Sequence, residues 1–354
     1  MLGADVPIEQ ADVLSMIIFN RPVNQLGDTQ RADYAFRQAG SMSAGTPQNL
    51  IRQMNHFALS GDAPSTVKTG LQVLDLTDRY DKTVFAAFDR SQSSVTEIAR
   101  QLSTRPRVRT AYFDHLVAAD SLIQEAGEAW QVLHDQLPPE SIAAYSATLL
   151  RNKAYATALQ VWRTTHPGTE EQQLYNGSFE TDLSKSPFDW ELQAGTQAHI
   201  ARAEGDAHDG RFTLQIQFAG TENLFYRAAS IETVLPPNQY VLTAWIRTDA
   251  ITTNEGPRLA IVDPENAAHL NVSTDGWTGT LPWTEVRLPF QVREETNIVR
   301  LELQRRDSFR FDSKIAGTFW LDDVRITPAP SPASKPHGYQ TGTATAHEVV
   351  SKVR

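Results

Sequence analysis

Apolar residues in the first half of the chain recur at spacings of three and four. The pattern runs from about residue 7 to 166, with turn-forming residues between successive segments. It is typical of paired amphipathic helices, each of which buries one stripe against a neighbour. The clearest predicted pair lies at 137–166, with a turn at 151–153, and another is expected at 46–76. We therefore predict a helical repeat domain over residues 1–168.

After residue 168 the period changes from helical to two. Apolar and polar residues alternate in segments that Pro, Gly, Asn and Asp separate: 213–218, 240–247, 258–262, 284–290, 298–304 and 318–326. Alternation in short segments between turn residues predicts an antiparallel β-sandwich, here over 169–328. A proline-rich run starts at Pro328, so residues 329–354 are expected to form an exit segment and a disordered tail.

The charge balance of the 354-residue chain disfavours polyanionic partners. There are 32 Lys and Arg residues against 42 Asp and Glu, a formal net charge of -10, so no nucleic-acid partner is expected. The absence of cysteine excludes disulfides, thiolate metal sites and cysteine nucleophiles. No apolar run is long enough to span a bilayer, so direct membrane insertion is not expected either.

Catalytic motifs are missing from the chain. The nine histidines show no metal-ligand spacing, such as two histidines separated by three residues. No nucleophile elbow, phosphate-binding glycine loop or dinucleotide fingerprint is present. Adjacent acids at 170–171 and 294–295 are interpreted as solvated charges and not as carboxylates opposed across a cleft. We predict that the protein is not an enzyme.

The last helical pair resembles tetratricopeptide repeats. Residues 155–162 read Tyr-Ala-Thr-Ala-Leu-Gln-Val-Trp, and the Ala-Tyr pair at 144–145 repeats the pair at 111–112 after 33 positions. That spacing is close to the tetratricopeptide period. The resemblance covers roughly residues 30–166. Because the hollow side of such arrays favours peptide or helix ligands, we expect a protein partner on the helical repeats.

Three signatures in the second half resemble jelly-roll carbohydrate-binding modules. They are Asn-Gly-Ser-Phe-Glu at 176–180, His-Asp-Gly-Arg-Phe-Thr-Leu at 208–214 and Gly-Thr-Phe-Trp-Leu-Asp-Asp-Val at 317–324. Together they are similar to modules of the family 4, 9 and 22 type, which share a galactose-binding-like sandwich. The resemblance covers residues 174–327. It implies the fold more strongly than a function, because this sandwich hosts many roles.

The same resemblance implies a structural calcium ion that clamps the two ends of the module. Its side-chain ligands would be Glu180 and Asp322, while residues from Asp209 to Arg211 would supply backbone oxygens. Strand alternation places Asp322 on the same face as the core residue Val324, where a carboxylate needs a partner. The alternative is that Asp322 caps a backbone turn.

A polar outer face around one tryptophan is the predicted sugar site. Apolar positions of the segment 240–247 alternate with Trp245 and Arg247, which are therefore expected to face outward. The same alternation applies to segments 213–218 and 298–304, and if these strands are neighbours of 240–247, the outer face carries Gln, Arg and Glu side chains around Trp245. Sugar rings stack on an aromatic face, and their hydroxyl groups bond amides, guanidinium groups and carboxylates. The candidate sugar ligands are Trp245, Arg247, Gln215, Gln217, Arg300 and Glu302, with Trp277, Phe225 and Tyr226 as further exposed candidates.

Two interpretations of Trp245 stay open from the residues alone. In one, its indole binds a glycan; in the other, a loop or the helical domain covers it, and the polar residues only solvate the sheet. The remaining tryptophans of the module, Trp190, Trp283 and Trp320, are expected in the core.

The combined resemblance is to bacterial repeat proteins that carry a carbohydrate-module-like C-terminal part. It implies a periplasmic or cell-envelope location and an exopolysaccharide setting. Our leading hypothesis is a non-enzymatic scaffold whose helical groove holds a protein partner while the jelly roll engages a polysaccharide. The alternative is a purely structural adaptor whose β module has no sugar ligand.

Overall fold

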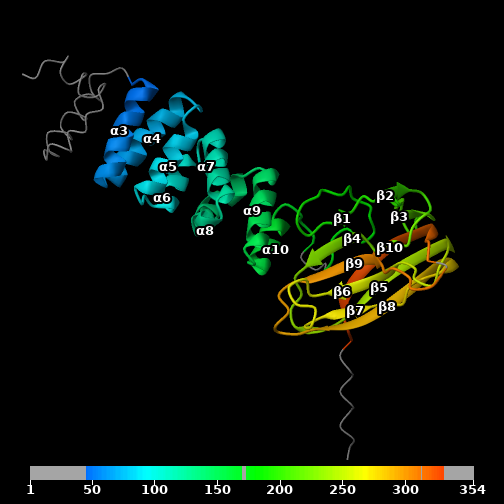
Figure 1. Ribbon diagram of the computed structural model, residues 1–354. Helices are drawn as coiled ribbons and strands as arrows, with labels where there is room; N and C mark the ends of the chain where they lie inside the picture. Colours follow the sequence, from blue (N-terminus) through cyan, green and yellow to red (C-terminus); the bar gives the residue numbers. More distant parts are fainter. Residues whose placement is uncertain (1–44, 170–172, 312, 331–354) are drawn as a thin grey trace, which may run out of the picture.

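The chain folds into a helical array followed by a β-sandwich, as the sequence predicts (Figure 1). The computed structural model describes residues 45–169, 173–311 and 313–330. The predictions made for residues 1–44 and 331–354, including most of the tail, lie outside the described residues. Within the described part of the chain, no helix is both long and apolar enough to cross a membrane.

Neighbouring helices of the array pack against one another in sequence order. Contacts join α3 to α4, α7 to α8 and α9 to α10. Alternate helices of the array also contact one another, α3 with α5, α5 with α7 and α7 with α9. The pairs predicted at 46–76 and 137–166 are confirmed. The helices are α3 (Pro47–Ser60), α4 (Ala63–Leu76), α5 (Asp81–Arg90), α6 (Val95–Leu102), α7 (Pro106–Ala118), α8 (Ile123–Leu133), α9 (Pro139–Arg151) and α10 (Tyr155–Arg163), with the 3-10 turns η2 (Asp120–Leu122) and η3 (His134–Gln136).

Local signals set the helix ends. Gly61 adopts a left-handed φ of 76° and ends α3, a conformation that an L side chain disfavours. Directly afterwards, the Asp62 carboxylate accepts a hydrogen bond from the Ser65 amide at 3.1 Å and caps α4. Proline in the first turn of α3, α4, α7 and α9 supplies a preset φ where no amide donor is needed.

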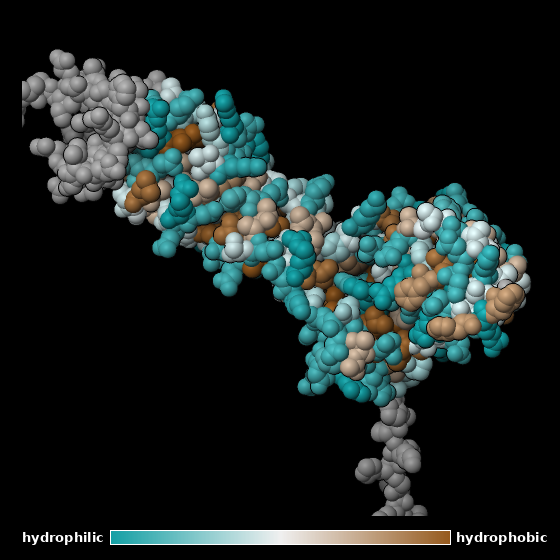
Figure 2. Space-filling model, in the orientation of Figure 1, coloured by the Kyte–Doolittle hydropathy of each residue, from teal (hydrophilic) through white to brown (hydrophobic). Residues whose placement is uncertain are grey.

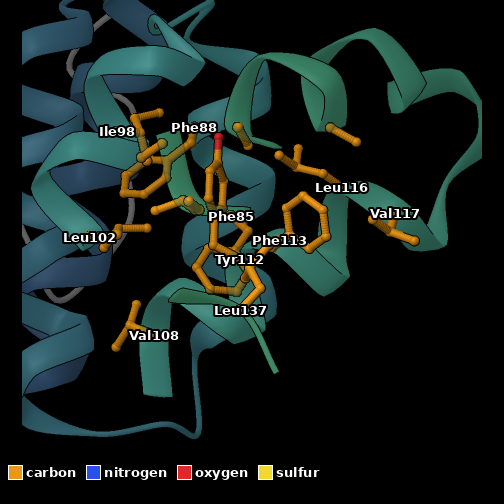
Figure 3. Packing of buried hydrophobic residues seen from close by; sticks show 14 of the residues in the cluster. Phe85, Phe88, Ile98, Leu102, Val108, Tyr112, Phe113, Leu116, Val117 and Leu137 are labelled. Atoms are coloured by element: carbon orange, nitrogen blue, oxygen red, sulfur yellow. The ribbon is translucent and has the colours of Figure 1, made fainter. Parts of the chain in front are cut away.

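Aromatic rings fill the helical core (Figure 3). Phe85 meets Tyr112 with 5.3 Å between ring centroids, and Phe113 meets Tyr145 at 5.4 Å. The array also depends on close approach between α4 and α5. A Cβ atom on Gly70 would lie only 2.5 Å from the Phe88 ring, so this position tolerates no side chain without local repacking.

The β-sandwich consists of two antiparallel sheets that enclose an apolar core. The first sheet has the order β1-β4-β9-β6-β7 and the second β2-β3-β10-β5-β8. Each of the six predicted strand segments coincides with a strand, whereas β1, β2, β4 and β7 were not predicted. The strands are β1 (Glu191–Leu192), β2 (Ala198–Glu204), β3 (Phe212–Ala219), β4 (Tyr226–Thr233), β5 (Asn238–Ile251), β6 (Arg258–Val262), β7 (Asn271–Ser273), β8 (Gly279–Val292), β9 (Val299–Arg305) and β10 (Ala316–Pro328).

A short connector ties the helical array to the sandwich. Phe188 packs into the helical core, and its ring lies 6.0 Å from that of Trp162 in α10. Two residues later, Trp190 packs into the sandwich core. Lys153, at the turn between α9 and α10, also forms an ion pair with Glu265 of the β6–β7 loop at 2.6 Å. Apolar residues gather in the notch where the two parts meet (Figure 2).

Candidate functional site

The outer face of the second sheet carries a row of residues from three adjacent strands. Gln215 of β3 pairs with Trp320 of β10, and Trp320 pairs in turn with Arg247 of β5. Paired residues of adjacent antiparallel strands project on the same side, so the three side chains are neighbours. Two residues before Arg247 on β5, and therefore on the same face, Trp245 lies opposite Asp322 of β10.

Trp245 lies on this outer face, as its strand alternation predicts. Its neighbours Ala244 and Ile246 are fully buried in the core, while the indole is partly exposed. His208, in the loop between β2 and β3, stacks on the indole with centroids 3.8 Å apart and an interplanar angle of 13°. Trp283 meets the imidazole edge-on at 5.8 Å. A loop residue therefore covers part of a ring that still faces outward.

Arg247 links the row to the same loop. Its guanidinium lies 4.4 Å from the centre of the Trp320 ring and forms an ion pair with Asp206 at 3.0 Å. A guanidinium stacked on an indole is attracted by the ring's negative face. Held in this way, Arg247 keeps a planar set of donors at the centre of the face.

Two tryptophans expected in the core belong to this outer face. Trp320 is buried, but it shares the side of Arg247 and is absent from the sandwich core cluster. Within the described residues its indole Nε1 has no hydrogen-bond partner. Trp283 is partly exposed and contacts His208. Only Trp190, at 1% exposure, is a core residue as predicted.

Polar groups surround these rings. The Gln217 amide donates to Gln215 at 3.3 Å, next to Trp320 in the register. On the other side of Trp245, Glu285 of β8 is its register partner, and its carboxylate accepts from Arg287 at 3.1 Å. Amide, guanidinium and carboxylate groups thus lie around flat aromatic surfaces.

Arg300 and Glu302 do not join this face, contrary to the prediction. Both lie on β9, in the first sheet, because the jelly-roll order places β10 and not β9 beside β5. Arg300 forms an ion pair with Glu232 and lines a groove of about 600 Å³ between α9 and the first sheet. Glu302 is 3% exposed and lies 3.5 Å from Arg227.

Trp277 and Tyr226 are not exposed site residues either. Trp277 stacks on Phe319 at 5.8 Å and covers the edge of the sandwich core. Tyr226 is 8% exposed, and its hydroxyl donates a hydrogen bond to the Gln193 carbonyl. Both positions precede or begin a strand, where the alternation rule gave no information about the facing side.

Asp322 is buried, but not on the core face. The pairing of β10 with β5 shifts between residues 322 and 325, and Asp323 adopts a left-handed φ of 47°. This β-bulge changes the phase of the strand, so Asp322 shares the outer side with Trp320 while Val324 packs into the core. Burial raises the pKa of Asp322 to about 6, although the amide of Asp323 donates to its carboxylate.

The predicted calcium ligands gather around the β2–β3 loop. Asp322 accepts from the amides of His208 at 2.8 Å and Asp209 at 3.4 Å. The Glu180 carboxylate accepts from the Arg211 amide at 2.8 Å and from the Phe212 amide at 2.9 Å, and these bonds hold its pKa below the ordinary value. Two carboxylates therefore bind the same loop through N–H groups.

This donor set does not by itself form a cation site. N–H groups, and not carbonyl oxygens, face the two carboxylates, although calcium requires oxygen ligands. Among the residues that the structure describes, no three His, Cys, Asp or Glu side chains are grouped closely enough to hold a metal ion. The turn-capping alternative agrees with the bonds of Asp322, and calcium binding stays a prediction.

Sequence reasoning missed the loop residues of this face. Asp206 and His208 follow β2, a strand that alternation did not reveal, and they reach Arg247 and Trp245 only because the loop folds back over the sheet. A hydrogen bond of 2.9 Å from the His208 ring to Asp323 helps to hold that loop. The motif at 208–214 indicated this loop, but it did not predict that His208 contacts the Trp245 indole.

Comparison with known proteins gives a resemblance for the sandwich. No protein-family model and no curated protein matches the chain. Among solved structures, a family 61 carbohydrate-binding module in complex with β-1,4-galactotriose is 17% identical, covering 45% of this chain and 100% of that one, with a TM-score of 0.31. The family 22 xylan-binding domain from Paenibacillus barcinonensis is 13% identical, with 44% and 93% covered and a TM-score of 0.32. A family 4 module is 16% identical, with 44% and 99% covered and a TM-score of 0.32.

Proposed function

We propose that the protein is a non-enzymatic scaffold whose β-sandwich binds a polysaccharide on the outer face of the second sheet. The observation that carries the proposal is the row Gln215–Trp320–Arg247 next to Trp245. Sugar rings present apolar C–H faces and a rim of hydroxyl groups. The partly exposed Trp245 offers indole surface, and Gln215 and Arg247 offer amide and guanidinium donors near it, which suits both features.

The helical array supports the second part of the proposal, a protein partner. A groove of about 580 Å³ crosses α8, α9 and α10, with Trp130 and Tyr145 in its lining. Its other lining residues include Gln131, Gln160 and Thr157, which are uncharged and can bond a peptide backbone. We propose that this groove receives an extended segment of a partner protein, with Trp130 against an apolar side chain.

A glycan array followed by titration calorimetry tests the sugar site. We expect the wild-type protein to bind one class of polysaccharide, and Trp245→Ala to weaken that binding about tenfold or more, because an aromatic contact of this size is lost. Trp130→Ala is the matched control, since it removes an indole from the helical groove and should leave glycan affinity unchanged. Equal affinity of wild type and Trp245→Ala would show that the sugar site is elsewhere.

The structural adaptor is the second candidate function. It is favoured by the contacts that the rings already have, since His208 stacks on Trp245 and Arg247 on Trp320. If the wild type binds no glycan across a broad array, this alternative holds. Screening an extended-peptide library against wild type and Trp130→Ala tests the helical groove in both cases. The proposed envelope location rests on the family resemblance and would be tested by cell fractionation.

A further inference from the structure

Two phenylalanines in the loop between β9 and β10, separated by Arg310, are fully exposed. Phe309 is 96% and Phe311 107% exposed, and Phe225, in the loop before β4, is 59% exposed. Phe309 and Phe311 therefore touch almost nothing in the protein and Phe225 is more than half exposed, although each ring would gain free energy by leaving water. We refer to Phe225, Phe309 and Phe311 as the phenylalanine tip.

The backbone beneath the phenylalanine tip is held in place. Buried Ser308 donates its amide to the Asn223 side chain at 2.8 Å, and the Asn223 amide group donates to the Ser308 carbonyl at 2.7 Å. The Ser308 hydroxyl also donates to Asn254 at 2.7 Å. The residue before Phe309 is thus fixed to both neighbouring loops, and the ring after it is directed away from the protein.

Arg305 organises the same three loops from inside. Its side chain is 1% exposed and donates to the carbonyls of Glu255 at 3.0 Å and Ser313 at 2.9 Å, to the Asn223 side chain, and to the carbonyl of Leu224. Burial lowers the pKa of this guanidinium. Five N–H donors in a rigid plane can serve several acceptors at once, so one residue joins the segments that carry all three rings.

We propose that the phenylalanine tip docks this end of the sandwich on a lipid surface. Phenylalanine has no polar atom, so these rings themselves form no hydrogen bond to a hydroxyl group or a peptide backbone. Protein hot spots lie within a packed rim that excludes water, whereas these rings stand clear of their neighbours. A lipid interface accepts apolar rings without shape complementarity. The exposed cations Arg306, Arg310 and Lys314 outnumber the acids Asp307 and Asp312 of the same loop, which suits anionic headgroups.

The location agrees with docking by one end. Lys153 and Glu265 join the helical array to the end of the sandwich near Arg300, while the phenylalanine tip follows Arg305 at the opposite end of β9. Lipid docking would therefore leave the helical array free. The proposal differs from the expectation of no direct membrane insertion. That expectation rested on the lack of a long apolar segment, which docking by a surface loop does not require.

Flotation with lipid vesicles tests the proposal. The full chain is mixed with vesicles of phosphatidylcholine containing a quarter phosphatidylglycerol, and with vesicles of phosphatidylcholine alone. We expect binding to the anionic vesicles that weakens as salt is added. The double variant Phe309→Ser/Phe311→Ser should bind about a hundredfold more weakly, because each ring contributes about tenfold when it leaves water.

The matched control is Leu59→Ser/Leu76→Ser, which removes two exposed apolar side chains from the helical array. It should bind vesicles like the wild type, as should Trp245→Ala, so failure here is distinguishable from failure of the sugar site. Absence of wild-type flotation, or equal flotation of the double phenylalanine variant, would overturn the proposal. It is also overturned if the wild type self-associates in vesicle-free buffer through these rings, since they then form a protein interface.

Discussion

Phe188 anchors the connector in the helical core, and its removal should destabilise the helical array and uncouple it from the sandwich. The side chain is 4% exposed and lies in the helical core cluster, although Phe179 before it and Trp190 after it lie in the sandwich core. Burial of a phenylalanine contributes about 1.5–3 kcal/mol, and an edge-to-face aromatic pair such as that with Trp162 adds about 0.5–1.5 kcal/mol. With the cavity left behind, Phe188→Ala should lower the free energy of unfolding by about 3–5 kcal/mol.

Urea denaturation followed by two probes measures this effect. Circular dichroism at the helical band reports on the array, and tryptophan fluorescence reports mainly on the sandwich, which holds five of the seven tryptophans. In the wild type we expect coincident transitions, because the connector packs into both cores. In Phe188→Ala the helical transition should move to lower urea and separate from the other.

The control for this experiment is Phe309→Ala, the same substitution at an exposed position. Its free energy of unfolding should stay within about 0.5 kcal/mol of the wild type. If Phe188→Ala costs less than about 1 kcal/mol, or if both probes still change together at an unchanged midpoint, the two parts do not depend on this contact and the reasoning is wrong.

Three further predictions concern charge, metal and backbone packing. The Lys153 ammonium, through its hydrogen bond, lowers the pKa of Glu265 below 4.5. This contact therefore stabilises the fold above pH 4.5, and its contribution is lost as the pH falls through the lowered pKa. Glu265→Gln should remove that part of the acid transition. Millimolar calcium should raise the wild-type melting temperature but not that of Glu180→Gln, and an unchanged wild-type midpoint with and without chelator would count against calcium. Gly177→Ala should destabilise by about 2 kcal/mol or more in urea denaturation, because the added Cβ would lie 1.9 Å from the Val324 carbonyl oxygen; a neutral effect would mean that β10 can shift.

Alternation along single segments was enough to orient Trp245 and Arg247. Side chains on a strand point to opposite faces in turn, so a local pattern determines which residues of one strand share a side. The same reasoning failed for Asp322 because the bulge at Asp323 inserts a change of phase that no periodicity reveals. Helix periodicity likewise located the pairs at 46–76 and 137–166, since a helix stripe is also a local property.

The composition of the outer face depended on contacts between distant segments. Arg300 has the same alternation as Gln215, yet the jelly-roll order places it in the other sheet. His208 reaches Trp245 because the β2–β3 loop is bound to Asp322, more than a hundred residues later. The sequence by itself therefore determined the two clearest helix pairs, six of the strands, the order of the two parts and the facing of residues along regular strands. Only the tertiary structure decided which strands are neighbours and what covers them, because pairing and loop packing arise from interactions between segments far apart in the chain.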